Sequence, residues 1–207
     1  MTDNKETSII IEQIYRVRKF ENELGLPERF FETIKEEDDW SFVIKLHALI
    51  EASITNILTD KFIDQDLVDI FSQMELSNKR TGKIAFIKKM NLLQKKYRNF
   101  ISKFSELRNL LVHEISNVKF SFKNYIDYLD ESQMKSLSNA LAVGIREKKS
   151  KNTSSYRLEQ FIKDPKLCIW ISALCLLSIL TVNKDLFAIE REHAKKNTEL
   201  IDSIIDL

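Results

Sequence analysis

Residues 40–59 read WSFVIKLHALIEASITNILT, and their apolar side chains recur at intervals of three and four residues. The repeating positions are Val43, Leu46, Ile50, Ile54 and Ile57. This spacing predicts a long helix with one buried face. Asp39 precedes the segment and is a candidate N-cap. We expect this helix to be the centre of the fold.

The segments on either side show the same helical periodicity. Further helices are predicted at residues 10–24, 28–35, 64–74, 83–93, 94–114, 131–149 and from Pro165 onward. Ser77 or Thr81 could cap the helix that begins near residue 83. Segments 83–93 and 94–114 could form one long helix or a helical hairpin, and segment 116–128 could be extended or an irregular loop.

Composition supports an all-α fold and one domain. Only 3 Gly and 2 Pro occur among 207 residues, whereas turn-rich β folds use many of both. A hydrophobic share of 43% with 30% charged residues predicts a folded core and not disorder. We expect a single domain over residues 1–207, with N-terminal helices at 1–38, a core bundle at 39–149 and C-terminal packing or dimer helices at 156–207. Residues 148–155 are the best candidate for an exposed loop.

The cysteine content and the N-terminus indicate a reducing compartment. Two cysteines cannot build a disulfide framework, and the polar start of the chain lacks the pattern of a signal peptide. The apolar run 167–182 is shorter than the roughly 18 to 25 residues that cross a bilayer, and charged residues flank it. We expect a buried or dimer-forming helix there, no membrane association and a cytoplasmic location.

The formal net charge of +1 is the sum of segments that carry opposite charge. Residues 21–75 contain 14 acidic and 4 basic residues, whereas residues 79–123 contain 12 basic and 2 acidic ones. Such asymmetry is typical of a surface for an anionic partner, or of two segments that attract each other within the fold or across an oligomer. Four lysines of the basic segment could follow a phosphate backbone or form an ordinary solvated face. They are Lys88, Lys89, Lys95 and Lys96.

Several familiar sites are absent from the sequence. There is no G-x-x-x-x-G-K-S/T, and the scattered glycines cannot build a phosphate-binding loop. The histidines at positions 47, 113 and 193 form no H-x-x-x-H, and no C-x-x-C occurs. We therefore expect no metal site and no cofactor.

Residues 104–114, FSELRNLLVHE, carry the most informative motif, because Arg108, Asn109 and His113 give R-N-x-x-x-H. This resembles the signature of the HEPN superfamily, small all-α domains whose arginine and histidine form a metal-independent ribonuclease centre at a dimer cleft. The earlier long helix, with polar His47 and Glu51, is similar to the layout of that family. The resemblance implies an HEPN-like antiparallel helical bundle with additional C-terminal helices, an RNA substrate and a role in defence or stress response, in which a neutralising protein partner can occur.

The chemistry suits these residue types. Cleavage of RNA without a metal needs a base for the 2′-hydroxyl proton and a cation for the charge on phosphorus. Histidine titrates near neutral pH and a guanidinium binds phosphate, so His113 would be the base or acid and Arg108 the phosphate clamp. Asn109 would position the phosphate or the histidine. His47 and Glu51 are supporting residues, for which a satisfied buried pair is the simpler interpretation. The resemblance implies a 2′,3′-cyclic phosphate product.

Helical geometry complicates this site. Residues five apart on a straight helix point about 140° away from each other, so Arg108 and His113 cannot face one cleft. HEPN proteins end or bend the helix at the motif and pair two subunits, so the resemblance implies a homodimer with the motif near its twofold axis. Simpler roles are an ion pair of Arg108 with Glu51 or Glu114, and compensation of the helix dipole by His113.

Two other functions compete with the ribonuclease. The first is a non-catalytic helical module that binds nucleic acid, a nucleotide or a protein, since the layout also resembles the mannitol operon repressor family, which is regulatory. The second is an interaction protein that assembles through residues 167–182. HEPN toxins paired with small nucleotidyltransferases carry a tyrosine shortly after the histidine, whereas Glu114, Ile115 and Ser116 follow it here.

Overall fold

The computed structural model describes residues 2–62, 67–146 and 153–205. Within these ranges the secondary structure consists of α-helices and one 3₁₀ helix, without a strand, which confirms the predicted all-α class. Much of the predicted loop at 148–155 lies outside the described residues, and Thr153 already begins a helix.

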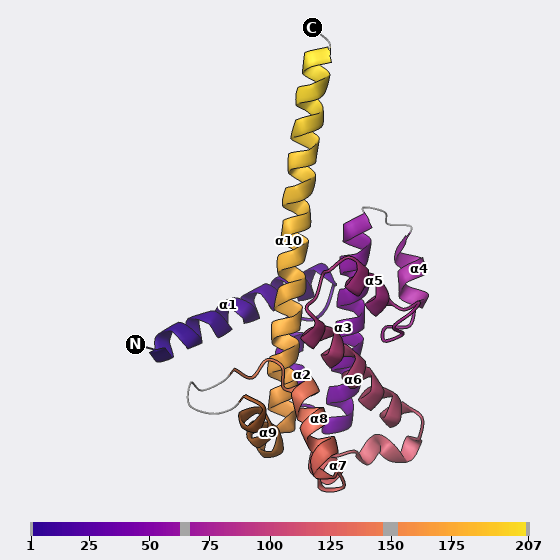
Figure 1. The fold of residues 1–207 in the computed structure, drawn as a ribbon, viewed down its shortest axis with the longest axis vertical. Coiled ribbons are helices and arrows are strands. Elements are labelled where there is room, and N and C mark those ends of the chain that lie inside the picture. The colour runs from indigo at the N-terminus through magenta and orange to yellow at the C-terminus, as the bar shows by residue number, and fades with distance from the viewer. Residues whose placement is uncertain (1, 63–66, 147–152, 206–207) are drawn as a thin grey trace.

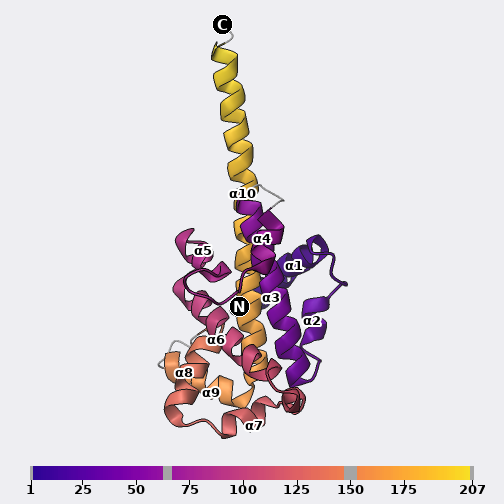
Figure 2. The same ribbon diagram turned by 90° about the vertical axis from the view of Figure 1, so that its right-hand side faces the viewer.

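Two long helices form the centre of the molecule. Helix α3 (Asp39–Phe62) packs along α10 (Pro165–Ile205), as Figures 1 and 2 show. The apolar repeat of α3 is buried as predicted, at Val43, Leu46, Ile50, Ile54 and Ile57. Each such side chain stabilises the fold by roughly 1.5–3 kcal/mol. The central position of α3 follows from this apolar face.

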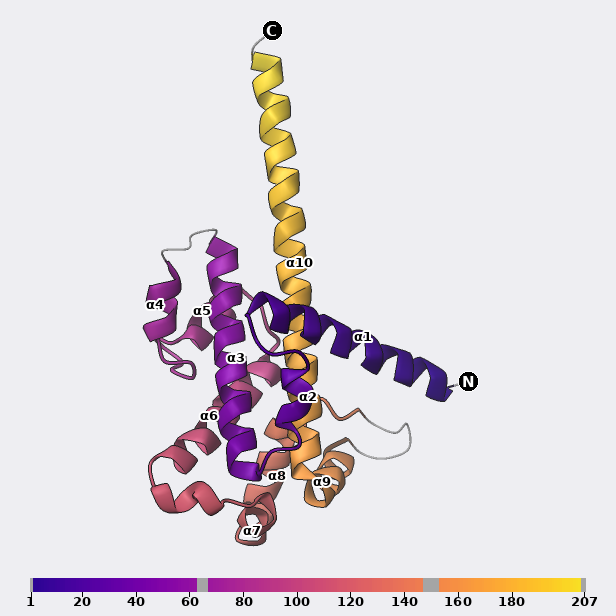
Figure 3. The same cartoon turned by 180° about the vertical axis from the view of Figure 1, so that it is seen from behind.

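The remaining helices surround this pair. Helix α1 (Thr2–Glu23) packs across α10, and α2 (Phe30–Ile34) and α4 (Leu67–Gln73) lie against α3 (Figure 3). Helix α6 (Lys95–Val112) packs on α3 and on α8 (Glu131–Leu141), which contacts α9 (Thr153–Lys163). Helix α6 therefore lies between α3 and α8.

The cap of α3 differs from the prediction. Asp38, and not Asp39, is the capping residue, because its Oδ1 accepts a hydrogen bond of 2.9 Å from the backbone N–H of Ser41. This hydrogen bonding with Ser41 lowers the pKa of Asp38. Asp39 instead accepts a bond of 2.9 Å from the backbone N–H of Phe122 and pairs with Lys166 at 3.4 Å. The predicted cap thus links three elements of the fold.

The basic segment forms two helices. Helix α5 (Lys83–Lys89) ends before Asn91, whose φ of 54° is left-handed and turns the chain toward α6. The predicted capping by Ser77 or Thr81 is wrong, because Gly82 is the N-cap of α5 and no side chain caps it. Asn78 explains the polar break, since its side chain accepts hydrogen bonds from the backbone of Arg80 and Thr81.

The segment after the motif is helical and not extended. It consists of the 3₁₀ helix η1 (Ile115–Lys119) and of α7 (Phe122–Asp127). Its alternating aromatic residues pack locally, because the ring centroids of Phe120 and Phe122 are 5.1 Å apart. Helix α8 ends at Leu141, well short of the predicted residue 149. A period of two in sequence therefore reflects aromatic clustering here, not a strand.

Helix α10 is one continuous helix of 41 residues, and its C-terminal part extends away from the body (Figure 1). The predicted burial of the run 167–182 is confirmed at Ile169, Ala173 and Leu177. By length and composition, Asp39–Phe62 and Pro165–Glu199 are long and apolar enough to cross a membrane, because they contain 18-residue windows with mean hydropathies of 1.3 and 1.9. Core helices pass the same test, so this finding by itself places neither helix in a membrane.

Candidate functional site

The R-N-x-x-x-H motif lies at the C-terminal end of α6. His113 is the C-cap, with φ of −73° and ψ of −22°, so the helical course continues through it. Glu114 is extended, with φ of −133° and ψ of 124°, and leads into η1. The indole N–H of Trp40 donates to the carbonyl of Leu111 at 3.3 Å, which attaches this end of α6 to α3. The motif therefore occupies a fixed helix end at the surface.

The guanidinium of Arg108 is half-buried and is oriented by its neighbour. Its Nη1 donates a hydrogen bond of 3.1 Å to Oδ1 of Asn109. Among the described residues no carboxylate pairs with Arg108, because Glu51 binds Lys83 and Glu114 forms no ion pair. The simpler structural role, an ion pair with Glu51 or Glu114, is therefore not what the chain adopts. The other donors of the guanidinium remain available.

Arg108 and His113 do not share a cleft within one chain. Because residue 113 keeps a helical backbone, their side chains point about 140° apart. His113 is exposed, and no hydrogen bond joins the two side chains in the described part of the chain. Exposed apolar residues surround this helix end. They are Leu110, Val112 and Val118, which are 50%, 40% and 47% exposed.

Buried His47 and half-buried Glu51 belong to one polar cluster. Nε2 of His47 lies 3.0 Å from Oγ of Ser105 on α6, and Nδ1 lies 3.9 Å from Oε2 of Glu51. Oε1 of Glu51 binds the ammonium group of Lys83 at 2.9 Å, and Lys83 is only 1% exposed. The cluster thus joins α3, α5 and α6, with His47 bonded to Ser105 and the partly exposed Glu51 bonded to Lys83.

Burial of its side chain keeps His47 neutral near pH 7. Burial lowers its pKa from 6.5 to about 4. Glu51 acts in the opposite direction, and the positive charges of Arg108 and Lys83 add to the lowering. Arg108 is therefore close enough to the cluster to act on it. His47 acts as a positioning residue for α6 and is poorly suited to take up a proton.

The candidate nucleic-acid lysines lie at the opposite end of α6. Lys88 and Lys89 occupy the last turn of α5, and Lys95 and Lys96 the first turn of α6. All four are exposed, and none forms an ion pair with a described residue. The rise of 1.5 Å per residue separates Lys95 from Arg108 by about 20 Å along the helix. The lysines and the motif would meet only on a ligand that extends along α6.

Within the described ranges, neither a metal-binding cluster nor an activated cysteine is found. No group of three or more His, Cys, Asp or Glu side chains suited to a metal ion occurs in the part of the chain that the structure describes. Both cysteines are free, and burial raises the pKa of Cys168 to about 12 and also raises that of Cys175. Thiols with raised pKa values are weak nucleophiles near pH 7.

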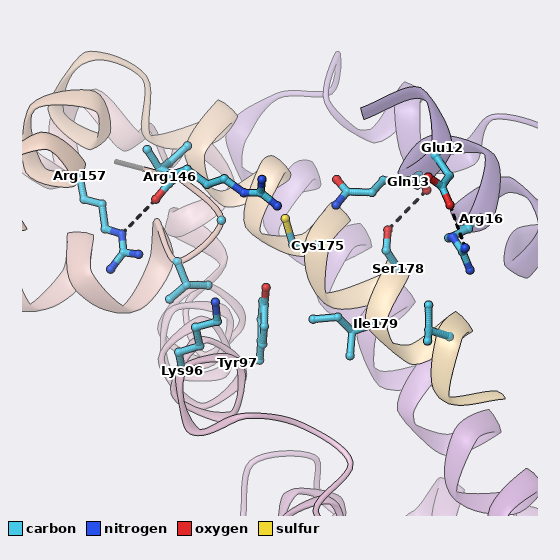
Figure 4. Close-up of a pocket in the computed structure, with 14 residues that line it drawn as sticks. Glu12, Gln13, Arg16, Lys96, Tyr97, Arg146, Arg157, Cys175, Ser178 and Ile179 are labelled. Atoms are coloured by element: carbon cyan, nitrogen blue, oxygen red, sulfur yellow. Dashed lines mark hydrogen bonds and ion pairs between the residues drawn. The ribbon is translucent and has the colours of Figure 1, made fainter. Parts of the chain in front are cut away.

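Sequence reasoning missed a cavity of about 600 Å³ between α1, α6, α9 and α10 (Figure 4). Its cationic side chains include Arg146 and Arg157, which no motif contains and which lie far from Lys96 in sequence. The basic character of residues around 146 was the available signal, but only folding brings these groups together.

Comparison with protein-family models, curated proteins and solved structures found no match to this chain. Any role assigned to Arg108, Asn109 and His113 must therefore be argued from their chemistry and from their placement in this fold.

Proposed function

We propose that the protein is a metal-independent endoribonuclease of the HEPN type, active as a homodimer and serving in defence or stress response. The observation that carries the proposal is the state of Arg108. Its guanidinium is held by Asn109 at 3.1 Å and is not neutralised by a described carboxylate, and the exposed His113 follows five residues later on the other side of the helix. An unpaired cation and an exposed histidine are the two groups that RNA cleavage requires, and a dimer would have to bring them together.

In the proposed reaction His113 takes the proton of a ribose 2′-hydroxyl. The 2′-oxygen then bonds to the adjacent phosphorus, and the bond from phosphorus to the 5′-oxygen breaks. Arg108 donates hydrogen bonds to the phosphate oxygens, on which negative charge accumulates in the transition state. A water molecule protonates the departing 5′-oxygen. The products are a 2′,3′-cyclic phosphate and a 5′-hydroxyl.

A second subunit solves the problem of orientation. Leu110, Val112 and Val118 expose apolar surface around the motif, and burial of such surface favours association. A twofold axis through this patch would bring Arg108 of one subunit toward His113 of the other. The apolar patch supports the proposed dimer, and the motif would then form two identical composite sites.

The second candidate function is a non-catalytic module that binds nucleic acid, as in a regulator similar to the mannitol operon repressor. It is favoured by Lys88, Lys89 and Lys95, which are exposed and form no ion pair in the described ranges. Such lysines bind phosphates without chemistry. This function requires nothing of His113.

Cleavage of labelled single-stranded RNA and tRNA in EDTA tests the first proposal against the second. We expect cleavage by the unaltered protein and a loss of about 100-fold or more in Arg108→Ala and His113→Ala. Arg80→Ala and His193→Ala are matched controls, because both residues are exposed and lie outside the motif. RNA binding without cleavage by a folded dimer would overturn the nuclease and favour the regulator.

Mixed dimers test whether the site is shared. A dimer of one Arg108→Ala and one His113→Ala subunit keeps one intact composite site. Random pairing makes half of the dimers mixed, so the mixture should recover about a quarter of the activity of the unaltered protein. If both groups act within one subunit, the mixture stays inactive.

A further inference from the structure

The cavity shown in Figure 4 lies away from the motif. Its volume of about 600 Å³ falls within the range typical of small-molecule sites. Its walls come from α1, α6, α9, α10 and the connection that follows α8. It lies beside the first turn of α6, about 20 Å along that helix from Arg108. The cavity is therefore separate from the motif.

One side of the cavity is cationic. Lys96, Arg146 and Arg157 reach it from three different segments, and none of them pairs with a described carboxylate. Nε of Arg157 donates to the carbonyl of Ile145 at 3.2 Å, which orients this guanidinium and leaves its Nη groups for a ligand. Arg16 differs, because it is neutralised by Glu12 at 2.9 Å and Asp185 at 3.8 Å. Three positive charges therefore face the cavity without a carboxylate partner in the part of the chain that the structure describes.

The three positive charges act on Tyr97 and Cys175, which also line the cavity. The hydroxyl of Tyr97 points into the cavity (Figure 4), although the residue is only 6% exposed, and it has no hydrogen-bond partner among the described residues. Burial raises the pKa of Tyr97 to about 12, and Arg146 and Arg157 oppose this rise. Arg146 and Lys96 likewise oppose the raised pKa of Cys175. Tyr97 thus remains a protonated hydrogen-bond donor among three cations.

Close packing against α10 holds the backbone at Gly144, three residues after the end of α8. The backbone N–H of Gly144 donates to Oγ of Ser172 at 3.0 Å. A Cβ atom at Gly144 would lie 2.8 Å from Cα of Ser172, so only glycine permits this approach to α10. Ile145 and Arg146 follow directly and line the cavity. The backbone that leads to Arg146 is therefore held against α10, which reduces the ordering that a ligand must impose on this part of the wall.

We propose that this cavity binds a phosphomonoester. The phosphate dianion lies among Lys96, Arg146 and Arg157 and accepts a hydrogen bond from Tyr97, while the organic part lies along Val143, Ile179 and Val182. Three cations match a dianion, and charge-assisted hydrogen bonds to phosphate are the strong ones. The ester has two sources, a free small molecule or the 5′-phosphorylated end of an RNA. The proposal stands independently of catalysis at the motif.

Calorimetric titration of the full-length protein at fixed ionic strength tests the proposal. The probes are 5′-AMP, phenyl phosphate, inorganic phosphate and adenosine. We expect both esters to bind more tightly than inorganic phosphate, and adenosine to bind weakly. Arg146→Glu should weaken ester binding at least about tenfold, because it removes a charge-assisted bond and adds repulsion. Lys163→Glu, an exposed unpaired position on α9, is the matched control and should leave binding unchanged.

Two further arms make the result decisive. Tyr97→Phe keeps the buried ring and removes only the hydroxyl, so it should weaken the esters without changing the melting temperature. A 5′-phosphorylated RNA tetranucleotide that displaces phenyl phosphate, compared with its 5′-hydroxyl form, identifies an RNA end, whereas its failure to displace identifies a free ester. The proposal is overturned if the esters bind no better than adenosine, or if Arg146→Glu and Lys163→Glu affect binding equally.

Discussion

Replacing His47 by glutamine probes the buried cluster that supports the motif helix. His47 lies 3.0 Å from the hydroxyl of Ser105, and glutamine can keep a hydrogen bond to that hydroxyl while it does not titrate. The charged groups that act on His47 are Glu51, which favours its protonation, and Arg108 and Lys83, which oppose it. The variant therefore isolates the proton uptake of one imidazole.

The size of the effect follows from the pKa shift. In the unfolded chain His47 titrates near 6.5, whereas in the folded protein its pKa is about 4. Between these values the unfolded state binds more protons, so stability is full above pH 6.5 and is lost as the pH falls toward 4. One pKa unit corresponds to about 1.4 kcal/mol, so the shift predicts a loss of about 3 kcal/mol.

Urea unfolding of both proteins between pH 7.5 and 4 measures this loss. We expect the difference in free energy of unfolding between the unaltered protein and His47→Gln to be constant above pH 7. Below that it should fall by about 3 kcal/mol as the pH approaches 4. His113 and His193 are present in both proteins, so their contributions cancel. A difference that does not change with pH would refute the burial of His47 against α6.

Three further predictions concern packing, capping and assembly. Gly144→Ala should destabilise the fold by about 1–3 kcal/mol in urea unfolding, since its Cβ would lie 2.8 Å from Ser172. Asp38→Ala should lower stability by about 1 kcal/mol in the same assay, because it removes the cap of α3. Leu110→Asp, at a position 50% exposed, should shift a dimer toward monomer in light scattering without lowering the melting temperature.

The helices could be predicted from sequence because their signal is local. The apolar repeat of residues 40–59 anticipates the buried face of α3, and Gly25, with φ of 68°, follows the end of α1. Scarce glycine and proline exclude the turn-rich alternatives. Such features depend on neighbours within a few residues, which a single sequence contains.

Two of the corrections involve contacts between distant segments. Asp39 binds the backbone of Phe122, 83 residues away, and Asp38 is left to cap α3. The chain leaves the helical path of α8 after Leu141, and Gly144 then meets Ser172 of α10. The local periodicity of the sequence does not indicate that Asp39 meets Phe122 or that Gly144 meets Ser172. The same reason explains the cavity, because Lys96, Arg146 and Arg157 converge only through the packing of α6 and α9 near α10.

The R-N-x-x-x-H motif combines a local sequence signal with an arrangement that local sequence does not determine. Its residues are neighbours on one helix, so sequence alone could single them out, and the helix does end at His113. Yet the folded chain points Arg108 and His113 about 140° apart, so no single subunit can bring them to one phosphate. A nuclease therefore requires a second copy of the chain, whereas a binding module does not. Activity regained by mixing the two inactive variants consequently decides between these functions more directly than the loss of activity in either one.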